Sequence, residues 1–232
     1  MEELFMQHYH FNPKNLFLGI LFLLFFTGVG LNIAIFFRPL YYWDISFLSL
    51  EKYSGLPKEE ILANYNALID YCSPFYSGAL NLPSLSVSPS AIGHFARVKI
   101  VFGIFDLLAI FSFVILLIHF IKRRTQLVFS QIITCGITTL AIPIFLGLCC
   151  FFFWEKTFVY FHKIFFSGDY WLFDWNTDSI IRILPDSFFL QCAALIIGVV
   201  ILGGILLLFY GYLQYSHTST PSCDSSGLQH KS

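Results

Sequence analysis

The chain has 232 residues, of which 57% are hydrophobic, 29 are Phe and only 12% are charged; its net charge is −1 and its mean hydropathy +0.73. This composition excludes an ordinary water-soluble domain, in which about a quarter of the residues are charged. No basic patch interleaved with aromatic residues is present, so nothing indicates nucleic acid as a partner.

Four apolar runs are long enough to cross a bilayer, whose hydrocarbon core of roughly 30 Å needs about 20 residues of helix. They are residues 16–37, 100–121, 127–154 and 188–212. The first run is too long for a removable signal peptide and continues into Phe-Phe-Arg-Pro, so it is expected to remain as an anchor. We therefore predict an all-α membrane protein of four transmembrane helices, with a kink at Pro143 in the third.

Four spans place both termini on one side of a cell membrane and two polar segments, 38–99 and 155–187, on the other. The short loop 122–126 carries Lys122, Arg123 and Arg124, which favours the cytoplasm for this loop and for the termini 1–15 and 213–232. Raw counting points the other way, with eight basic residues in the two polar segments and five elsewhere. Long segments cross with little regard to charge, so the dense short loop decides the predicted orientation. The polar C-terminal tail is expected to be disordered.

The first polar segment predicts a small, mainly helical extracellular cap. Residues 57–72 have Pro57 at the first helical position, Glu59 and Glu60 in the first turn, and apolar residues at helical spacing. An irregular stretch rich in Pro, Gly and Ser follows. Ser90 is then expected to cap a helix that runs through His94 into the second span.

Two histidines are the candidate catalytic residues, because both lie just outside a span on the cap side. They are His94, before the second span, and His162, after the third. An imidazole with its ordinary pKa of about 6.5 can take and return a proton near neutral pH. The alternative is that each is only an amphipathic anchor at the interface. The other histidines are assigned to the cytoplasmic side: His8, His10, His119, His217 and His230.

The acidic residues after His162 invite a metal interpretation. Asp174, Asn176 and Asp178 alternate as in a calcium loop, but the Gly and Glu that such a loop needs are absent. Turn capping by Asp174 and Asp178 is the simpler reading, with Trp171 and Trp175 at headgroup depth (sequence 161–178: FHKIFFSGDYWLFDWNTD). A zinc site formed by the two histidines and Asp169 remains an alternative, and we predict no metal and no cofactor.

Further polar residues lie in or beside the second span. Asp106 is an intramembrane carboxylate, which needs a partner or a purpose. It shares a helix face with Lys99 and could pair with it, although a polar contact between helices is the preferred explanation. Cys72 and Ser73 are the nearest candidate nucleophiles, and nothing in the sequence activates them. The six cysteines follow no C-x-x-C pattern, so disulfides are not predicted.

Three stretches resemble the lipoprotein intramolecular transacylase family, a group of four-span membrane proteins of Gram-positive bacteria. They are SGLPKEEILANYNALIDY, SAIGHFARVK and FHKIFFSGDYWLFDWNTDSIIRILPDSFF. The resemblance implies an acyltransferase that moves an acyl chain within a diacylglyceryl lipoprotein, from the sn-2 ester of its modified cysteine to the α-amino group of that cysteine, giving the lyso-form. Its two functional histidines would be His94 and His162. One departure is Arg97, where the family often carries an acidic residue.

The chemistry of this reaction fits the candidate residues. Exchange of an ester for an amide is downhill and needs no ATP or coenzyme. A base must take a proton from the attacking amine, and a donor must stabilise the oxyanion and protonate the leaving glycerol oxygen. The two imidazoles could do both, with Asp169 or Asp174 fixing a tautomer and Arg97 and Lys99 as further supporting candidates. The expected partners are diacylglyceryl lipoproteins of the outer leaflet and membrane lipid.

Two rival functions stay open at this point. A non-enzymatic membrane accessory protein would use the cap only for protein contacts. An intermolecular lipid acyltransferase would use Cys72 or Ser73 as a covalent relay.

Overall fold

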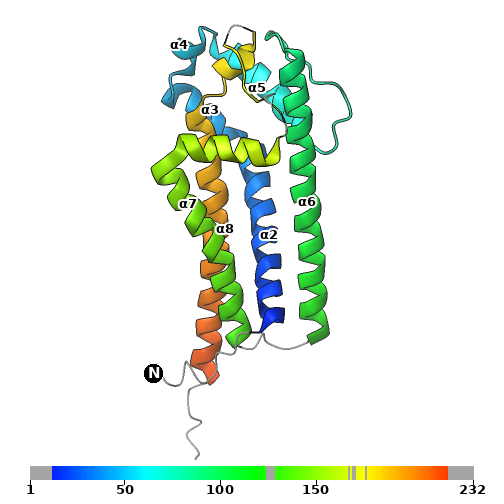
Figure 1. The fold of residues 1–232 in the computed structure, drawn as a ribbon, viewed down its shortest axis with the longest axis vertical. Helices are drawn as coiled ribbons and strands as arrows, with labels where there is room; N and C mark the ends of the chain where they lie inside the picture. Colours follow the sequence, from blue (N-terminus) through cyan, green and yellow to red (C-terminus); the bar gives the residue numbers. More distant parts are fainter. Residues whose placement is uncertain (1–11, 124–128, 167, 169–170, 176, 219–232) are drawn as a thin grey trace, which may run out of the picture.

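Four long helices run through the molecule side by side, and a cluster of short helices covers one end of them (Figure 1). The computed structural model describes residues 12–123, 129–166, 168, 171–175 and 177–218. The long helices are α2 (Pro13–Phe36), α6 (Pro89–Arg123), α7 (Phe129–Phe165) and α8 (Asp186–Thr218). All four are long and apolar enough to cross a membrane, which confirms the predicted fold class. The predicted cytoplasmic segments 1–15, 122–126 and 213–232 fall partly or largely outside the described residues.

Three of the long helices begin before the apolar runs that predicted them: α2, α6 and, by only two residues, α8. The first, α2, begins at Pro13, with the Asn12 side chain accepting a hydrogen bond from the amide of Lys14 at 2.9 Å. The next, α6, begins at Pro89, and the hydroxyl of Ser88 accepts from the amide of Ala91 at 3.1 Å. The prediction that Ser90 caps this helix is wrong, because Pro89 suits the first helical position and leaves the cap to the residue before it.

Helix α2 lies at the centre of the bundle, and its glycines let the other helices approach closely. A Cβ on Gly28 would lie 2.4 Å from the Cβ of Ala109 in α6, and one on Gly30 would lie 3.1 Å from the Cα of Ile196 in α8. Membrane helices lack a hydrophobic drive toward each other and associate through such close backbone packing. Gly28 and Gly30 of α2 therefore determine how closely α6 and α8 pack against this helix.

Helix α7 changes direction at Phe153, whose φ of −139° and ψ of 44° are not helical. The part before the break runs with the bundle, and the part after it lies across the bundle just below the cap (Figure 1). This break lies ten residues after Pro143, where the sequence predicted a kink. Helical structure also continues to Phe165, beyond the predicted end of the third span at Trp154. This crossing part mixes Lys156 and Lys163 with exposed aromatic residues, as interfacial helices do.

The cap consists of α3 (Arg38–Phe47), α4 (Leu50–Ser54), α5 (Lys58–Cys72) and the short 3-10 helix η1 (Ser179–Arg182). Helix α5 confirms the helix predicted over residues 57–72, whereas α3 was not predicted. The core of the cap is a stack of Tyr41 on Tyr65, with ring centroids 3.6 Å apart. The Tyr41 hydroxyl donates to the carbonyl of Ile183 at 2.6 Å, which ties the segment before α8 to the cap.

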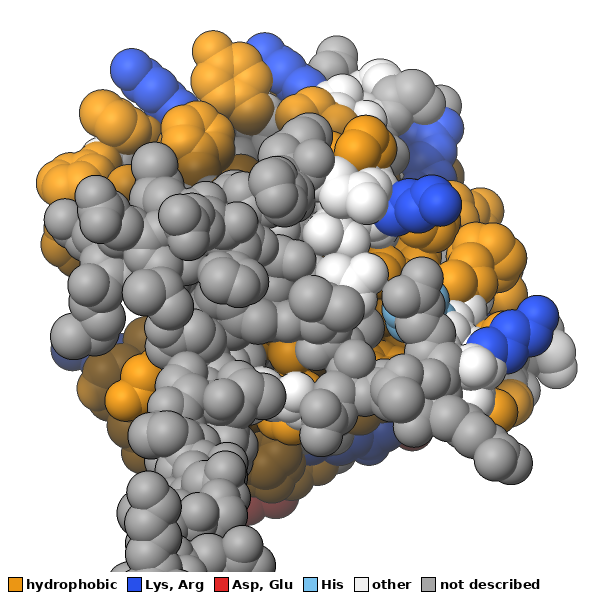
Figure 2. Space-filling model, turned by 90° about the horizontal axis from the view of Figure 1, so that it is seen from below, with side chains coloured by type: hydrophobic (Ala, Val, Ile, Leu, Met, Phe, Trp, Pro, Cys, Tyr) orange, Lys and Arg blue, Asp and Glu red, His pale blue; other side chains and the backbone are white. Residues whose placement is uncertain are grey.

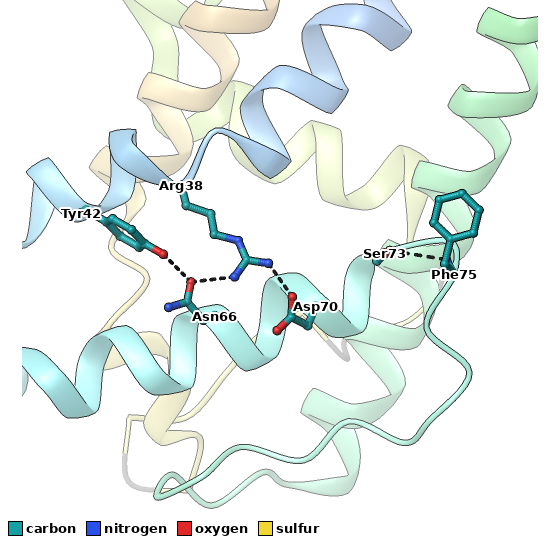
Figure 3. Close-up of polar contacts among 6 residues, drawn as sticks. All are labelled: Arg38, Tyr42, Asn66, Asp70, Ser73 and Phe75. Atoms are coloured by element: carbon teal, nitrogen blue, oxygen red, sulfur yellow. Dashed lines mark hydrogen bonds and ion pairs between the residues drawn. The ribbon is translucent and has the colours of Figure 1, made fainter.

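Polar contacts join α5 to the start of α3 (Figure 3). Arg38 donates to Asn66 at 3.0 Å and to Asp70 at 2.5 Å, and the Tyr42 hydroxyl donates to Asn66 at 2.8 Å. The Arg38 and Asp70 side chains are partly exposed, so their ion pair adds little stability. We therefore regard the cluster as fixing the position of α5 over the end of α2.

The flanks of the bundle are apolar. Seen from the end opposite the cap, orange apolar side chains occupy much of the described surface, with Lys and Arg side chains at its periphery (Figure 2). On α6 the exposed residues include Ile100, Ile104, Leu107 and Phe111. Such a surface is stable in lipid and would be costly in water.

Candidate active site

His94 and His162 come together directly beneath the cap. His94 lies near the start of α6, and His162 lies in the crossing part of α7. Their ring centroids are 5.8 Å apart and their planes are inclined by 22°. Both side chains are buried, at 6% and 9% exposure. Two imidazoles that lie 68 positions apart in the chain thus share one enclosed site.

Aromatic side chains enclose this imidazole pair. Phe166, itself buried, contacts both rings, with centroid distances of 4.8 Å to His94 and 5.5 Å to His162. The other aromatic neighbours are Phe95, Phe158, Phe161, Trp171 and Phe173. The ring of Trp171 lies 4.9 Å from that of His162, so it lines the site in addition to any role at headgroup depth. An enclosure of this kind excludes water and strengthens polar interactions inside it.

The backbone fixes which nitrogen of His162 is protonated. Its Nδ1 lies 2.8 Å from the carbonyl oxygen of Phe158, one helical turn earlier. A carbonyl oxygen only accepts, so Nδ1 carries the hydrogen. The neutral ring then has its lone pair on Nε2, and this nitrogen is available to accept a proton.

His94 differs, because its Nδ1 is buried and has no hydrogen-bond partner among the residues that the structure describes. Buried polar atoms in proteins are almost always paired, and those that are not call for an explanation. A buried Nδ1 without a partner, beside a second imidazole, can form a hydrogen bond with a polar group of a ligand.

The start of α6 is held by a residue that the sequence indicated only as a turn cap. Asp178 is 2% exposed and accepts hydrogen bonds from the Ser88 hydroxyl, from the Thr177 hydroxyl at 3.2 Å and from the amide of Asp174 at 3.2 Å. Asp178 therefore connects the segment after His162 to the helix that carries His94. The sequence signal was its place in the turn, which does not predict its burial.

The predicted supporting residues have different locations. Asp174 is exposed and begins the turn that ends at Asp178. Asp169 lies outside the described residues. Arg97 is partly buried and follows His94 by three positions, on a neighbouring part of the same helix face.

Lys99 and Asp106 point away from the imidazole pair and do not pair with each other. Lys99 donates to the carbonyl of Tyr76 and lies 4.9 Å from the ring centroid of Tyr71. Asp106 accepts from the Asn32 side chain of α2 at 2.6 Å. The preferred explanation of Asp106, a polar contact between helices, is thus observed. Lys99 is five positions after His94, which rotates it by about 140° around the helix.

The two candidate nucleophiles are in poor positions for catalysis. Cys72 is 6% exposed, and burial raises the pKa of its thiol to about 12. The Ser73 hydroxyl accepts from the amide of Phe75 at 3.4 Å (Figure 3). Among the described residues, no hydrogen bond joins either side chain to an imidazole, so neither has a histidine base beside it. The described cysteines are free, and no cluster of three or more His, Cys, Asp and Glu side chains suitable for a metal is found in the described part of the chain.

Fold and site together define a class: a membrane protein of four helices with a buried pair of imidazoles, enclosed by aromatic rings, where its cap meets the bundle. A family model described as lipoprotein intramolecular transacylase matches residues 16–189. The chain therefore belongs to the lipoprotein intramolecular transacylase family, which makes it an acyltransferase. The family resemblance seen in the three sequence stretches is confirmed.

Solved structures agree with this assignment. The chain is similar to the membrane integral lipoprotein intramolecular transacylase Lit from Bacillus cereus, at 32% identity and a TM-score of 0.82, over 89% of this chain and 96% of that one. Two further structures of the same protein carry a histidine substitution, to arginine or to alanine, with TM-scores of 0.74 and 0.70. At 32% identity they cover 94% and 89% of this chain and 99% and 94% of theirs. No curated protein sequence matches the chain.

Proposed function

We propose that this transacylase moves the sn-2 acyl chain of a diacylglyceryl cysteine to the α-amino group of the same cysteine, giving a lyso-form lipoprotein, and that His94 and His162 carry the proton transfers. The observation that supports this proposal most strongly is the pair of buried imidazoles 5.8 Å apart inside one aromatic enclosure. Two imidazoles in such a site can transfer protons to and from a lipid-borne substrate without a cofactor.

His162 is assigned as the general base. Its Nε2 bears the lone pair, because Nδ1 donates to the Phe158 carbonyl. The amine nitrogen attacks the sn-2 carbonyl carbon, a C–N bond forms, and Nε2 takes the proton that the nitrogen loses. The C–O bond of the ester then breaks, and the same proton can pass to the glycerol oxygen. Ester and amine become amide and alcohol, with no oxidant or coenzyme in the balance.

His94 is assigned as the donor to the oxyanion. Its unpartnered Nδ1 would carry the hydrogen and donate to the carbonyl oxygen as negative charge develops there. In a water-poor enclosure such a bond contributes more than it would in water. The different surroundings of the two histidines thus argue for different roles.

The aromatic enclosure would also reduce the entropy that the flexible substrate loses on reaching the transition state. Attack of the amine on the sn-2 carbonyl closes an eight-membered ring of N, Cα, Cβ, S, two glycerol carbons, O and the carbonyl carbon. Held in a reactive conformation, such groups can reach effective molarities of about 10⁵ M or more. Phe166 and Trp171, which pack on the imidazoles, would restrict where a flexible substrate can lie.

We further infer that the site faces the outer leaflet and that the termini are cytoplasmic. The basic residues of the short loop between α6 and α7 support this orientation. The cap lies at the other end of the bundle, together with the start of α6 and the crossing part of α7, which carry the two histidines (Figure 1). A diacylglyceryl lipoprotein anchored in the outer leaflet would then present its modified cysteine at the depth of the site. Asp169, Asp174 and Arg97 stay supporting candidates, although the Phe158 carbonyl suffices to set the tautomer of His162.

An isotope crossover experiment tests the proposed reaction. Two diacylglyceryl peptides with free amino termini are mixed with the purified protein, one light throughout and one heavy in both the peptide and the sn-2 chain. Mass spectrometry of the products should find every heavy chain N-linked to a heavy peptide. Mixed light and heavy products would contradict transfer within one molecule and favour a covalent relay. Transfer of the sn-1 chain instead, seen as a light chain N-linked to a heavy peptide, would contradict the assigned donor ester.

A further inference from the structure

A second pocket lies on α6, on the side of the helix that faces away from His94. Its volume is about 300 Å³, and Cys72 and Pro74 at the end of α5 form one wall. Helix α6 forms the other wall, mainly with Lys99, Ile100 and Gly103. The aromatic enclosure contributes none of these residues. The pocket is therefore distinct from the transfer site.

Its mouth lies at the depth of lipid headgroups. Lys99 directly precedes Ile100, where the long apolar run of α6 begins. Ile100 is 62% exposed, and Phe75, in the chain segment just after Pro74, is 95% exposed. Large apolar side chains as exposed as these are favourable in lipid and costly in water. Below them the exposed apolar surface of α6 continues through Ile104 and Leu107.

The Lys99 side chain is held in place, and its ammonium keeps N–H donors available for a ligand. Its ammonium donates to the carbonyl of Tyr76, and the rings of Tyr71 and Tyr76 lie 4.9 Å and 5.4 Å from Nζ. An ammonium has three N–H donors, so two remain for another acceptor. The ring contacts limit the motion of a long side chain, which lowers the entropy lost on binding. Among the described residues, Lys99 is the only cation that lines the pocket.

The space below Lys99 suits an acyl chain. A Cβ on Gly103 would meet no atom within 4 Å, so the pocket is open at this turn of the helix. Asp106 also lines the pocket, but it lies seven positions beyond Lys99, about 10 Å deeper along the helix. Its carboxylate accepts from Asn32 and is too deep to compete for the Lys99 ammonium.

We propose that this pocket binds one anionic phospholipid of the leaflet on the cap side, with the phosphate on Lys99 and an acyl chain over Gly103 and Ile100. The lipid is a bound ligand and does not react. Charge complementarity selects an anionic headgroup over a zwitterionic one, and the apolar wall selects a lipid over a free phosphate.

Native mass spectrometry after release from nanodiscs tests the proposal. The nanodiscs contain equal amounts of phosphatidylglycerol and phosphatidylcholine, and the wild-type protein should retain phosphatidylglycerol in preference. Lys99→Gln should reduce this retention about fivefold, the factor that corresponds at 25 °C to the roughly 1 kcal/mol that one lysine contributes to binding anionic lipid. Gly103→Leu should reduce it as well, because leucine would fill the space for the acyl chain without a backbone clash.

Two variants serve as controls. Lys99→Arg keeps the charge and should keep the lipid, which separates loss of charge from loss of folding. Lys156→Gln removes the same charge from the crossing part of α7, where it lies near the ring of Phe153, and should leave retention unchanged. Equal retention of the two lipids by the wild type, or no effect of Lys99→Gln, would overturn the proposal. Full retention in Gly103→Leu would mean that the site binds only the phosphate and no acyl chain, and this result would also overturn the proposal.

Discussion

The hydroxyl of Tyr41 provides a sensitive test of how the cap is assembled. It donates to the carbonyl of Ile183 at 2.6 Å, and both residues are fully buried. Burial raises the pKa of Tyr41 far above its usual range, so the hydroxyl keeps its proton and stays a donor. Tyr41→Phe removes the donor, keeps the stacked ring and leaves the carbonyl of Ile183 unpaired.

A buried acceptor without a partner costs about 1 to 3 kcal/mol. We expect Tyr41→Phe to lower the free energy of unfolding by that amount in a denaturant titration of the protein in detergent. Tyr65→Phe is the matched control, because Tyr65 stacks on Tyr41 and no hydrogen bond of its hydroxyl is found among the described residues. Its effect should stay within about 0.5 kcal/mol. Equal losses for the two variants, or a larger loss for Tyr65→Phe, would refute this account of the contact.

Three further predictions concern topology, metals and the rival nucleophiles. In a cysteine-free background, an impermeant thiol reagent added to intact cells should label Cys at position 51 and not at position 122; the reverse would overturn the orientation. Transfer by the purified protein should survive EDTA or a zinc chelator, whereas a loss restored by zinc would make His94 and His162 metal ligands. Cys72→Ala and Ser73→Ala should keep near wild-type rates, since the thiol of Cys72 is buried with its pKa raised to about 12; loss of transfer in either would restore the covalent relay.

The sequence predicts the parts of this structure that depend on local pattern. The apolar runs identify the four spans, and the charge and periodicity of residues 57–72 identify α5. Four antiparallel spans also bring His94 and His162 to the same end of the bundle, because each lies just beyond an apolar run, 100–121 or 127–154. Their proximity follows from the connectivity, whereas their 5.8 Å separation does not.

The remaining features depend on contacts between distant segments. The break in α7 occurs at Phe153 within a run of three Phe residues, and nothing local distinguishes this position from its neighbours. The crossing part of α7 then places His162 against α6, where Trp171 turns toward it. Asp178 is also defined by a distant partner, Ser88, 90 positions away. Periodicity cannot predict such pairings, because each partner is set by the packing of the whole cap.

The central claim is that His94 and His162 act together in the transfer, and rates on a diacylglyceryl peptide with a free amino terminus test it most directly. We predict that His94→Asn and His162→Asn each slow transfer by about 10² to 10⁴, at equal membrane abundance. The double variant should be little worse than either single one, because groups that act as a unit are not additive. His119→Asn, near the other end of α6, is the control and should keep the wild-type rate. Near wild-type transfer by either His94→Asn or His162→Asn would contradict the account and leave that histidine as an interfacial anchor.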